Sequence, residues 1–522
     1  MCGILFTNRP GIEREEFLAA LATMQHRGPD SPGGYARLGD SQLGHNRLSV
    51  VDLNPRSDQP FWSRDRRHVI VFNGEIYNYR ELARAHGIVL RTGSDTELLL
   101  ELWQRHGQKM LGWLYGMFAF VILDTVTGET FVARDRLGVK PLYVHESDEG
   151  VIVASELAAI LQLVPDAAVD AFAVRQYRAM RGFFGGRTLY QGIEMFPAGC
   201  FARNGKITRF WSLPEGPQAP PEDDELDALL RSAVDYRLIA DVPVGSYLSG
   251  GLDSSIIAAL AQRSHTWVTG LPDENEFLWA AQAARHLGTE HRAIVVTPGR
   301  FPETAREMIA ARREPLAVPN EVLLFEMTRA VKTKNTVVLS GEGADELFAG
   351  YDRIFRWAGE SRAWDLREFA RRYCYGGEPD LEVVEDAVAP FVGRGEPFAI
   401  VSAFFQIAHL HGLLRRLDNA TMLCGVEGRV PFVDHRLVER LAGVPLDYKM
   451  AAGVVKAPLK RVFGHLLPPA IVNRPKVGFP VNLDRVLPRG GSAGTGTAMD
   501  RWFDFNLSAL GLETDPVIPA CT

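Results

Sequence analysis

The second residue of the chain could act as a nucleophile together with its own backbone amine. Cys2 follows the initiator methionine and precedes Gly3, so removal of Met1 would leave a cysteine with a free α-amine. An α-amine titrates near pH 8 or slightly below, far under a lysine side chain, so near neutrality part of it is an unprotonated base. One residue then supplies both nucleophile and general base. The alternative is a small buried residue that begins the first strand, because free cysteines are usually buried.

Three later segments offer the other groups that attack on a glutamine amide requires. Such attack needs donors for the tetrahedral oxyanion, a cation for the substrate carboxylate and an anion for its ammonium group. Asn73, the Gly74 backbone N–H and Glu75 follow one another in the chain, Arg47 precedes them, and Asp95 comes after. Each has an ordinary alternative: Asn-Gly is usually a hairpin turn, and a lone Arg or Asp is usually a solvated surface charge.

A glycine-rich segment at 241–255 could bind phosphate. It reads Asp-Val-Pro-Val-Gly-Ser-Tyr-Leu-Ser-Gly-Gly-Leu-Asp-Ser-Ser and is predicted to run from a strand into a helix. Small residues let the backbone approach an anion, and the N–H groups at the helix start and the Ser hydroxyls are donors. The Gly-Lys-Ser/Thr of the Walker loop is missing, so transfer of a γ-phosphate is not favoured. A plain Gly-rich turn capped by Asp253 is the alternative.

A second cluster of polar residues follows the predicted strand at 336–339. Glu342, Asp345 and Glu346 come within seven residues after Ser340. Carboxylates after a strand end could hold Mg²⁺, orient a nucleophile or merely cap a helix.

The elements expected around these residues divide the chain near residue 210. Strands are predicted at 69–72, 117–123, 130–133, 142–144 and 151–154, with helices at 13–24 and 96–106 and turn signals at Asn73-Gly74 and Thr127-Gly128. The Pro/Gly-rich acidic stretch 213–225 is typical of a linker. A strand at 245–248, a loop at 249–255, a helix at 256–262 and strands at 266–269 and 336–339 then predict a parallel doubly wound sheet. Helices dominate 355–441, and 489–497 is expected to be a surface loop.

Composition favours a soluble enzyme of small molecules. The chain has 522 residues, of which 46% are hydrophobic and 23% charged, with a net charge of −7. Such a length predicts two or more domains, and the absence of basic blocks argues against a nucleic-acid partner. The five cysteines form no CxxC pair, which is typical of a reducing cytoplasm without disulfides or zinc. The longest apolar stretch, 111–123, is too short for a membrane helix, and no signal peptide is visible.

The N-terminal segments resemble the class II glutamine amidotransferase domain. The resemblance rests on Met-Cys-Gly-Ile at the start, His-Arg-Gly-Pro-Asp at 26–30, the segment around Arg47, Asn-Gly-Glu-Ile-Tyr-Asn at 73–78 and Gly-Ser-Asp at 93–95. It implies that Cys2 is the nucleophile and that Asn73 and Gly74 form the oxyanion hole. It also implies that glutamine is bound by Arg47, Leu48, Val51, Asn73, Gly74, Glu75 and Asp95.

The later segments are similar to those of the asparagine synthetase family. Ser-Gly-Gly-Leu-Asp-Ser at 249–254 is similar to the pyrophosphate loop of ATP pyrophosphatases, and Ser-Gly-Glu-Gly-Ala-Asp-Glu at 340–346 and Gly-Val-Glu-Gly-Arg-Val-Pro-Phe-Val-Asp at 425–434 resemble family segments. By this resemblance Glu342 assists adenylate formation or ammonia attack, and Lys456 neutralises phosphate charge. ATP or pyrophosphate is expected to contact Leu248, Ser249, Gly250, Gly251, Asp253, Ser254, Thr269, Ser340 and Gly341.

The resemblance implies a fold and a reaction for each domain. Residues 1–210 are expected to form an α+β N-terminal nucleophile hydrolase sandwich (αββα), and residues 211–522 an α/β doubly wound parallel-sheet ATP pyrophosphatase domain with a helical C-terminal part. The expected reaction is ATP-consuming, glutamine-dependent amidation of a carboxylate through an acyl-adenylate, with Mg²⁺ held through ATP by Asp253 and Asp345, and with an enclosed passage for ammonia. A homodimer is the expected assembly.

The acceptor is expected to be aspartate, but one segment departs from the family pattern. In well-studied bacterial members a Thr- and Arg-bearing segment precedes the Glu-bearing loop, whereas residues 313–321 here read Arg-Glu-Pro-Leu-Ala-Val-Pro-Asn-Glu. Another carboxylate from a natural-product or cell-envelope pathway is therefore an alternative. A β-lactam synthetase or peptide-cyclising enzyme is a further one, although neither needs the residues around Cys2. A non-catalytic regulatory protein would be expected to have lost Cys2 or Asp253.

Overall fold

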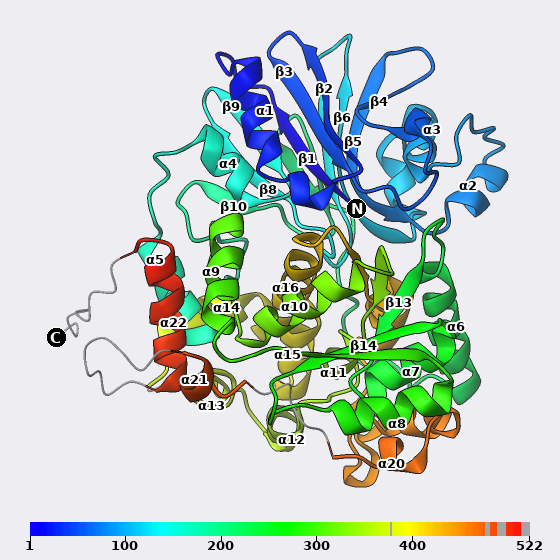
Figure 1. The fold of residues 1–522 in the computed structure, drawn as a ribbon, viewed down its shortest axis with the longest axis vertical. Coiled ribbons are helices and arrows are strands. Elements are labelled where there is room, and N and C mark those ends of the chain that lie inside the picture. Colours follow the sequence, from blue (N-terminus) through cyan, green and yellow to red (C-terminus); the bar gives the residue numbers. More distant parts are fainter. Residues whose placement is uncertain (376–377, 476–480, 488–496, 513–522) are drawn as a thin grey trace.

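The N-terminal part of the chain is built from two antiparallel six-stranded sheets (Figure 1). The computed structural model describes residues 1–375, 378–475, 481–487 and 497–512. The first sheet has the order β10 (Ile193–Met195), β8 (Tyr143–Ser147), β9 (Gly150–Ala154), β1 (Cys2–Thr7), β3 (Ser41–Arg47), β2 (Ser31–Leu38). The second has the order β12 (Lys206–Arg209), β11 (Cys200–Arg203), β7 (Thr130–Arg134), β6 (Gly116–Asp124), β5 (His68–Ile76), β4 (Phe61–Trp62).

The two sheets face each other and carry helices on their outer faces. Ile4 and Phe6 of β1 belong to the same buried cluster as Val71 of β5, whereas Leu5 packs with Phe17 of helix α1. This is the alternation expected of a strand whose two faces are both covered. The helices that cover the sheets are α1 (Arg14–Ala22) and α4 (Leu157–Leu163) on the first, and α2 (Tyr79–Ala85) and α3 (Asp95–His106) beside the second. The αββα sandwich expected from the sequence is confirmed.

The C-terminal part is built on a five-stranded sheet in which every neighbouring pair is parallel. Its order is β15 (Glu290–Val295), β14 (His265–Gly270), β13 (Val244–Tyr247), β16 (Val337–Leu339), β17 (Glu427–Arg429). The chain moves outward from β13 to β15 and then returns to the other side of β13 with β16. The strand order therefore reverses between β13 and β16, and ligands of doubly wound sheets bind beyond the carboxyl ends of strands at such a point.

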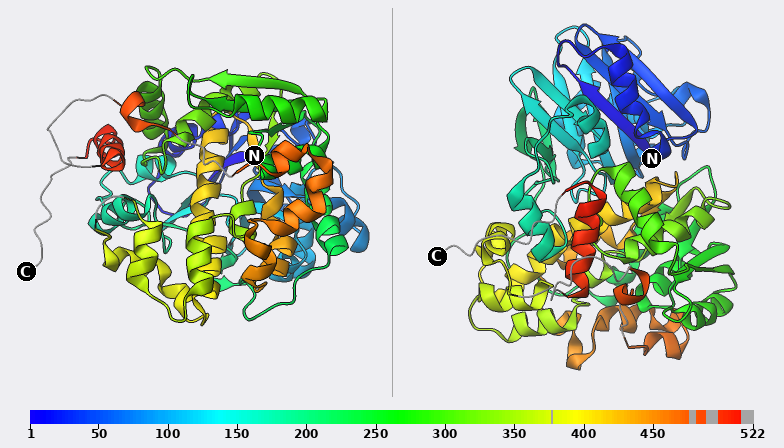
Figure 2. Two further views of the ribbon diagram at one scale, coloured as in Figure 1. Left: turned by 90° about the horizontal axis from the view of Figure 1, so that it is seen from below. Right: turned by 60° about the vertical axis from the view of Figure 1, so that its left-hand side comes forward.

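Helices cover this sheet and extend into a large helical region (Figure 2). Those that contact the sheet are α7 (Leu252–Ala261), α8 (Phe277–Leu287), α10 (Asn320–Val331) and α16 (Leu410–Met422), and α6 (Asp223–Arg237) and α9 (Phe301–Arg312) pack against α7 and α10, respectively. The others are α5 (Ala171–Met180), α11 (Ala344–Leu347), α12 (Asp352–Glu360), α13 (Leu366–Tyr373), α14 (Leu381–Val392), α15 (Pro397–Phe404), α17 (His435–Leu441), α18 (Leu446–Lys449), α19 (Ala457–Phe463), α20 (Pro469–Val472), α21 (Leu483–Val486) and α22 (Ala498–Ala509).

Three local expectations differ from the structure. The predicted linker 213–225 ends early, because helix α6 already begins at Asp223 and its acidic first turn suits the positive end of the helix dipole. Helix α7 begins at Leu252 rather than at 256, for the same reason: Asp253 lies in its first turn. Asn73 and Gly74 form no turn but lie inside strand β5. The loop expected at 489–497 lies outside the described residues except for Thr497.

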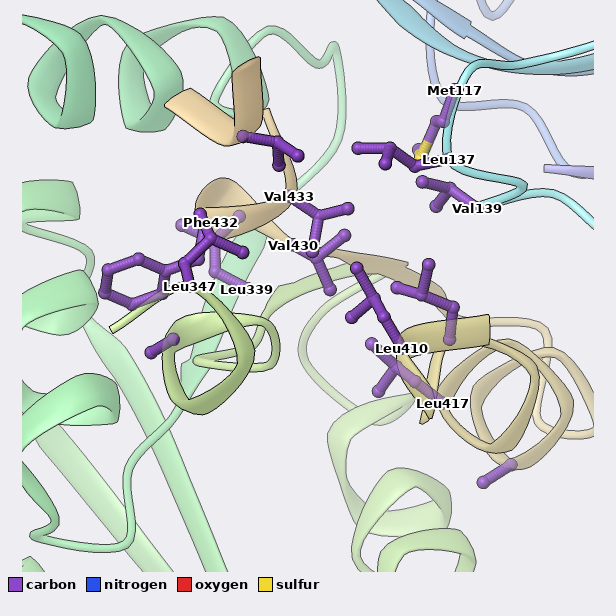
Figure 3. Close-up of a cluster of buried hydrophobic side chains, with 14 of the residues drawn as sticks. Met117, Leu137, Val139, Leu339, Leu347, Leu410, Leu417, Val430, Phe432 and Val433 are labelled. Atoms are coloured by element: carbon purple, nitrogen blue, oxygen red, sulfur yellow. The ribbon is translucent and has the colours of Figure 1, made fainter. Parts of the chain in front are cut away.

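An apolar cluster joins the two halves of the chain (Figure 3). It brings Met117 and Leu137 of the N-terminal part together with Leu339 and Val430 of the C-terminal part. Residues 397–422 form a helical run that is long and apolar enough to cross a membrane by these two criteria. In the apolar 18-residue window of this run, however, 56% is buried inside the fold. The run contributes Leu410 to the same cluster, so packing within the protein explains its composition.

Two candidate active sites

Three neighbouring strands bring the N-terminal candidates together. Cys2 begins β1 opposite Arg47, the last residue of β3, and its backbone N–H donates to Oδ1 of Asn73 on β5 at 3.0 Å. The Cys2 carbonyl accepts a hydrogen bond from Nε of the buried Arg27 at 3.1 Å. The cysteine is buried, and these two hydrogen bonds hold its backbone on both sides.

The electrostatics around the thiol act in opposite directions. Burial raises the pKa of Cys2, whereas the chain-terminal ammonium, a hydrogen bond from the Leu48 backbone and the Arg47 guanidinium lower it. In the chain that retains Met1 the effect of burial is larger, so the pKa of the Cys2 thiol is raised. A base close to the thiol is therefore needed if Cys2 is to react as a thiolate near neutral pH.

Asn73 and Gly74 lie beside Cys2 and leave a buried hydrogen-bond donor there. Because Oδ1 of Asn73 accepts from Cys2, its Nδ2 is the donor that remains, and this buried atom has no hydrogen-bond partner among the described residues. A side chain at Gly74 is excluded, since a Cβ there would lie 2.1 Å from the Met117 carbonyl oxygen of β6. The Asn-Gly pair therefore serves close strand packing beside Cys2 and not a hairpin turn.

Arg47 is fixed by the loop that follows it. Its Nη1 donates to Asp58 Oδ1 at 2.7 Å, and its Nη2 donates to the carbonyl oxygens of Val51 and Asp52 at 3.3 and 2.5 Å. The backbone N–H of Leu48 donates to the Met1 carbonyl oxygen at 3.1 Å. The residues expected to bind glutamine on this side thus surround the first two residues of the chain.

Four buried charged groups close the site on the other side. Burial raises the pKa of Asp95 to about 6, and burial together with Asp95 raises the pKa of Glu75 well above its usual range. Glu75 lies 3.5 Å from Nη2 of Arg429, and Arg429 donates to Glu427 at 2.6 Å. The last two residues come from β17 of the C-terminal part, so both halves of the chain form this site.

Glu427 also binds the chain terminus. The Met1 ammonium lies 3.0 Å from Glu427 Oε2, and the two side chains are fully buried. Although burial opposes it, Arg429 and the terminal ammonium lower the pKa of Glu427 to about 2. No role was expected for Glu427 or Arg429 from the sequence. Two opposite charges spaced two residues apart, with Val426 and Val430 on either side, were the available signal, because residues with this spacing share one face of a strand.

The glycine-rich loop lies where the strand order of the parallel sheet reverses. Gly250 has a φ of +73°, and a Cβ there would lie 2.4 Å from the backbone of Trp279, so only glycine fits. The hydroxyl groups of Ser249 and Ser254 lie 3.1 Å apart and bond to each other. On the next strand, the Thr269 hydroxyl oxygen is buried without a hydrogen-bond partner among the described residues, while the Leu248 N–H is used by the sheet.

Lys456 holds the two loops of this site together. Its Nζ lies 2.5 Å from Asp253 Oδ2 and 2.6 Å from Asp345 Oδ1. Burial opposes the charge, but the two carboxylates raise the pKa of Lys456 above its usual value. Gly341 packs against the same place, because a Cβ there would lie 3.0 Å from the Ser254 backbone nitrogen. Residues separated by two hundred positions in the sequence thus meet in one corner of the structure.

The three carboxylates after β16 have three different environments. Asp345 pairs with Lys456, whereas Glu342 pairs with Arg416 of helix α16. Glu346 accepts from the Tyr351 hydroxyl at 2.6 Å, and burial followed by Asp345 raises its pKa to about 8. None of them caps helix α11, whose N-cap has no side-chain hydrogen bond. The capping interpretation is therefore wrong.

Candidate metal ligands are few in this region. Asp253 and Asp345 converge on one ammonium, but the described part of the chain has no group of three His, Cys, Asp or Glu side chains arranged to hold a metal. The described cysteines, Cys2, Cys200, Cys374 and Cys424, are all free.

Two arginines near this site, Arg416 and Arg474, were not predicted from the sequence. Arg474 lies 2.5 Å from Glu276 and donates to the Ser249 carbonyl at 3.4 Å.

Strand β17 connects the two sites directly. The Ser340 N–H donates to the Arg429 carbonyl oxygen at 2.9 Å, while the Arg429 side chain faces Glu75 and Glu427. The apolar cluster in Figure 3 also runs between the sites, because Met117 pairs with Glu75 across the sheet and Leu339 immediately precedes Ser340.

Comparison with known proteins matches both halves of the chain. Residues 1–211 match the family model described as glutamine amidotransferase domain, and residues 225–493 match the one described as asparagine synthase. The chain is similar to asparagine synthetase B [glutamine-hydrolyzing] of Escherichia coli, with 30% identity over 89% of this chain and 79% of the relative. Asparagine synthetase 1 of Bacillus subtilis is 29% identical over 92% and 87%.

Two further comparisons are less informative. A Mycobacterium tuberculosis protein is 33% identical over 94% of this chain and 89% of its own length, and its assignment as a glutamine-hydrolysing asparagine synthetase is provisional. Glutamine phosphoribosylpyrophosphate amidotransferase of Bacillus subtilis is a structural neighbour with 18% identity and a TM-score of 0.32, covering 56% of this chain and 65% of that one. At that TM-score the two folds share too little to support a conclusion.

Proposed function

Because the chain belongs to the asparagine synthase family of glutamine-dependent ligases, we propose that it uses ATP to convert a carboxylate into a carboxamide. Glutamine is the nitrogen donor and aspartate the proposed acceptor, so the products are asparagine, glutamate, AMP and pyrophosphate. One observation carries the proposal: groups suited to amide hydrolysis around Cys2 and groups suited to phosphate binding around Lys456 lie on the two sides of strand β17.

In the proposed first reaction Cys2 acts after Met1 has been removed. Its α-amine takes the thiol proton while the sulfur attacks the amide carbon of glutamine. Nδ2 of Asn73 and the Gly74 N–H stabilise the oxyanion. The amine then protonates the departing nitrogen, ammonia leaves, and water hydrolyses the thioester to glutamate and free thiol. Arg47 is proposed to bind the carboxylate of glutamine, and the buried acidic side chains of Glu75 and Asp95 are proposed to accept hydrogen bonds from its ammonium group.

In the proposed second reaction the acceptor is activated beyond β13 and β16. A carboxylate oxygen attacks the α-phosphorus of ATP, the bond to the β-phosphate breaks, and pyrophosphate leaves into the loop 249–255. Lys456 neutralises the charge that develops on the phosphates. Ammonia then attacks the acyl carbon, AMP departs, and a proton is transferred from the nitrogen. Glu342 is the carboxylate of the 340–346 loop that is proposed to accept it, because Asp345 pairs with Lys456 and Glu346 accepts from Tyr351.

Asp253 and Asp345 fit Mg²⁺ bound together with ATP. Magnesium is commonly held by one or two carboxylates plus substrate phosphates, and these two carboxylates converge within 2.6 Å of one ammonium. Bound there, the ion would add positive charge next to the phosphates. Lys456 is the positive group of the corner that faces the phosphates, and the two aspartates hold its ammonium in place.

Ammonia must pass between the sites without being protonated. The cluster of Met117, Leu137, Leu339 and Val430 offers an apolar environment between them. Burial in such surroundings disfavours an ammonium ion relative to neutral ammonia. This supports a passage for ammonia along the Figure 3 cluster.

The identity of the acceptor acid is the part of the proposal for which there is an alternative. Arg312, which directly precedes the segment that departs from the family pattern, pairs with Glu314 and Glu321 of that segment at 2.7 and 2.9 Å, and its side chain is only 4% exposed. A guanidinium used in this way is not offered to a substrate. This observation favours testing other carboxylic acids beside aspartate.

The test is pyrophosphate release from ATP with a panel of acids, each with glutamine or with ammonium as nitrogen source. Aspartate should support release and asparagine formation with either source. Cys2→Ala should abolish glutamine-driven synthesis and keep ammonia-driven synthesis, because the synthetase residues are untouched. Equal loss of both activities in this variant, or no release with any acid, would contradict the proposal. The homodimer stays a prediction, which light scattering of the purified protein can test.

A further inference from the structure

Arg416 of helix α16 reaches from the helical region into the synthetase site. Its Nη2 pairs with Glu342 Oε1, and its Nη1 donates to Oδ1 of Asn320 at 3.3 Å. Glu342 belongs to the loop whose Gly341 packs against Ser254. Asn320 begins helix α10 directly after the segment that departs from the family pattern. The guanidinium therefore lies between the adenylation loop and the variable wall of the site.

The guanidinium has donor capacity that the protein does not use. Nε of Arg416 is buried and has no hydrogen-bond partner among the residues that the structure describes. Nε and Nη2 form one edge of the guanidinium fork, and this edge matches the two oxygens of a carboxylate. At present only Nη2 of that edge is occupied, by one oxygen of Glu342.

The surroundings distinguish Arg416 from the other arginines nearby. Its side chain is 14% exposed and that of Glu342 22% exposed, so the pair borders the site. Arg312 is 4% exposed and is bound by two carboxylates. Arg415, the preceding residue, lies 3.8 Å from the buried Glu314 and stacks over Phe183. Nε of Arg312 and Nη1 of Arg415 are also without hydrogen-bond partners among the described residues, but these two side chains are only 4% and 9% exposed. Arg416 is thus the most exposed of the three, with one ion pair in the described part of the chain and a half-occupied edge.

We propose that Arg416 is the acceptor-binding residue that holds a second carboxylate of the acid, the one that is not activated by ATP. The inference rests on the proposed function and names the class of acceptor: a dicarboxylate such as aspartate, and not a monocarboxylic acid. The acceptor carboxylate takes the Nε and Nη2 edge, and Glu342 is released toward the acyl-adenylate. Asn320 keeps Nη1 in place during this exchange.

Aspartate and β-alanine test this directly, because β-alanine is aspartate without its α-carboxylate. With ammonium as nitrogen source, kcat/KM for pyrophosphate release is compared for both acids in the wild type, Arg416→Gln and Arg416→Lys. The wild type should prefer aspartate. Loss of a charge-assisted carboxylate contact should raise KM for aspartate about 10- to 100-fold in Arg416→Gln, with KM for ATP unchanged, so that the preference over β-alanine collapses. Arg416→Lys should keep part of the preference for aspartate over β-alanine.

Arg415→Lys is the matched control, since it changes the neighbouring arginine of the same helix. It should keep the aspartate preference, and glutamate release from glutamine should be intact in all variants because that site is separate. If Arg416→Gln retains the wild-type preference for aspartate over β-alanine, the inference is wrong while the proposed function stands. If the wild type neither binds aspartate by calorimetry nor activates it, the inference fails together with the proposed acceptor.

Discussion

Replacing Lys456 by methionine tests whether one ammonium holds the synthetase site together. The lysine lies 2.5 and 2.6 Å from oxygens of Asp253 and Asp345. At an effective dielectric constant of about 20, each contact represents a gross attraction of about 6 kcal/mol. Desolvation cancels much of this, and deletion of one member of a buried ion pair typically destabilises a protein by about 3–5 kcal/mol. The lower end applies here, because the two aspartates are 22% and 23% exposed.

Lys456→Met should lose synthetase activity and keep glutaminase activity, so the effect on activity should be specific to one site. Removing one group that stabilises developing charge lowers kcat by about 100- to 1000-fold, so ammonia-driven pyrophosphate release should drop by that factor while glutamine hydrolysis continues. Without the ammonium the two carboxylates repel each other, and this repulsion is present only while both are ionised. The destabilisation should therefore be largest at neutral pH and should shrink as the pH falls and the carboxylates are protonated.

Lys449→Met is the matched control for this experiment. Lys449 is also buried, but its Nζ donates to the Leu441 carbonyl at 2.9 Å and contacts no carboxylate in the described residues. Both variants are compared by pyrophosphate release, glutamate release and urea unfolding. Full synthetase activity in Lys456→Met would refute the role of this ammonium. Equal loss of glutaminase activity would show that the substitution damages the whole protein instead of one site.

Three further predictions concern the other site and the stability of the fold. Asn73→Ala should lower glutamine hydrolysis about 100- to 1000-fold, as loss of an oxyanion donor does, and leave ammonia-driven synthesis unchanged; a comparable fall in both activities would contradict the role of Nδ2. Intact mass spectrometry of active enzyme should show a chain shorter by the initiator methionine, and full glutaminase activity with Met1 retained would remove the proposed base. Burial lowers the pKa of Lys449 to about 7, below its value of about 10.4 in an unfolded chain, so stability should rise between pH 7 and pH 10. Thermal unfolding at both ends of that range should show this rise for the wild type and not for Lys449→Met.

The sequence predicted most elements because their signals are local. The buried apolar run of β6 and the glycine-rich connection between β13 and α7 need no long-range information to be recognised. The resemblance placed Cys2, Asn73 and Arg47 in one set, and the register of β1 with β3 and the Cys2–Asn73 hydrogen bond bring them together. Where local rules competed, the tertiary structure decided: Asn73-Gly74 has turn composition, yet pairing with β6 extends the strand through it.

Residues whose roles depend on distant partners could not be predicted. Arg416 and Glu342 are separated by 74 positions, and no periodicity in either segment indicates that they meet. Lys456 was found only through the family resemblance, since a single lysine is ordinarily a surface charge. The sequence also gives no reason to connect Arg429 with Glu75, because their contact exists only after the two halves have packed.

The packing of β17 means that the glutamine site is a property of the whole chain. Asp95 raises the pKa of the buried Glu75, and the guanidinium that lies next to Glu75 and lowers its pKa comes from Arg429. A fragment that ended near residue 210 would keep Cys2 and Asn73 but would lack this cation. The same Arg429 offers its carbonyl to Ser340. The wall that completes the first site is therefore the strand that supports the second, and neither half of the chain contains a complete pair of reactions by itself.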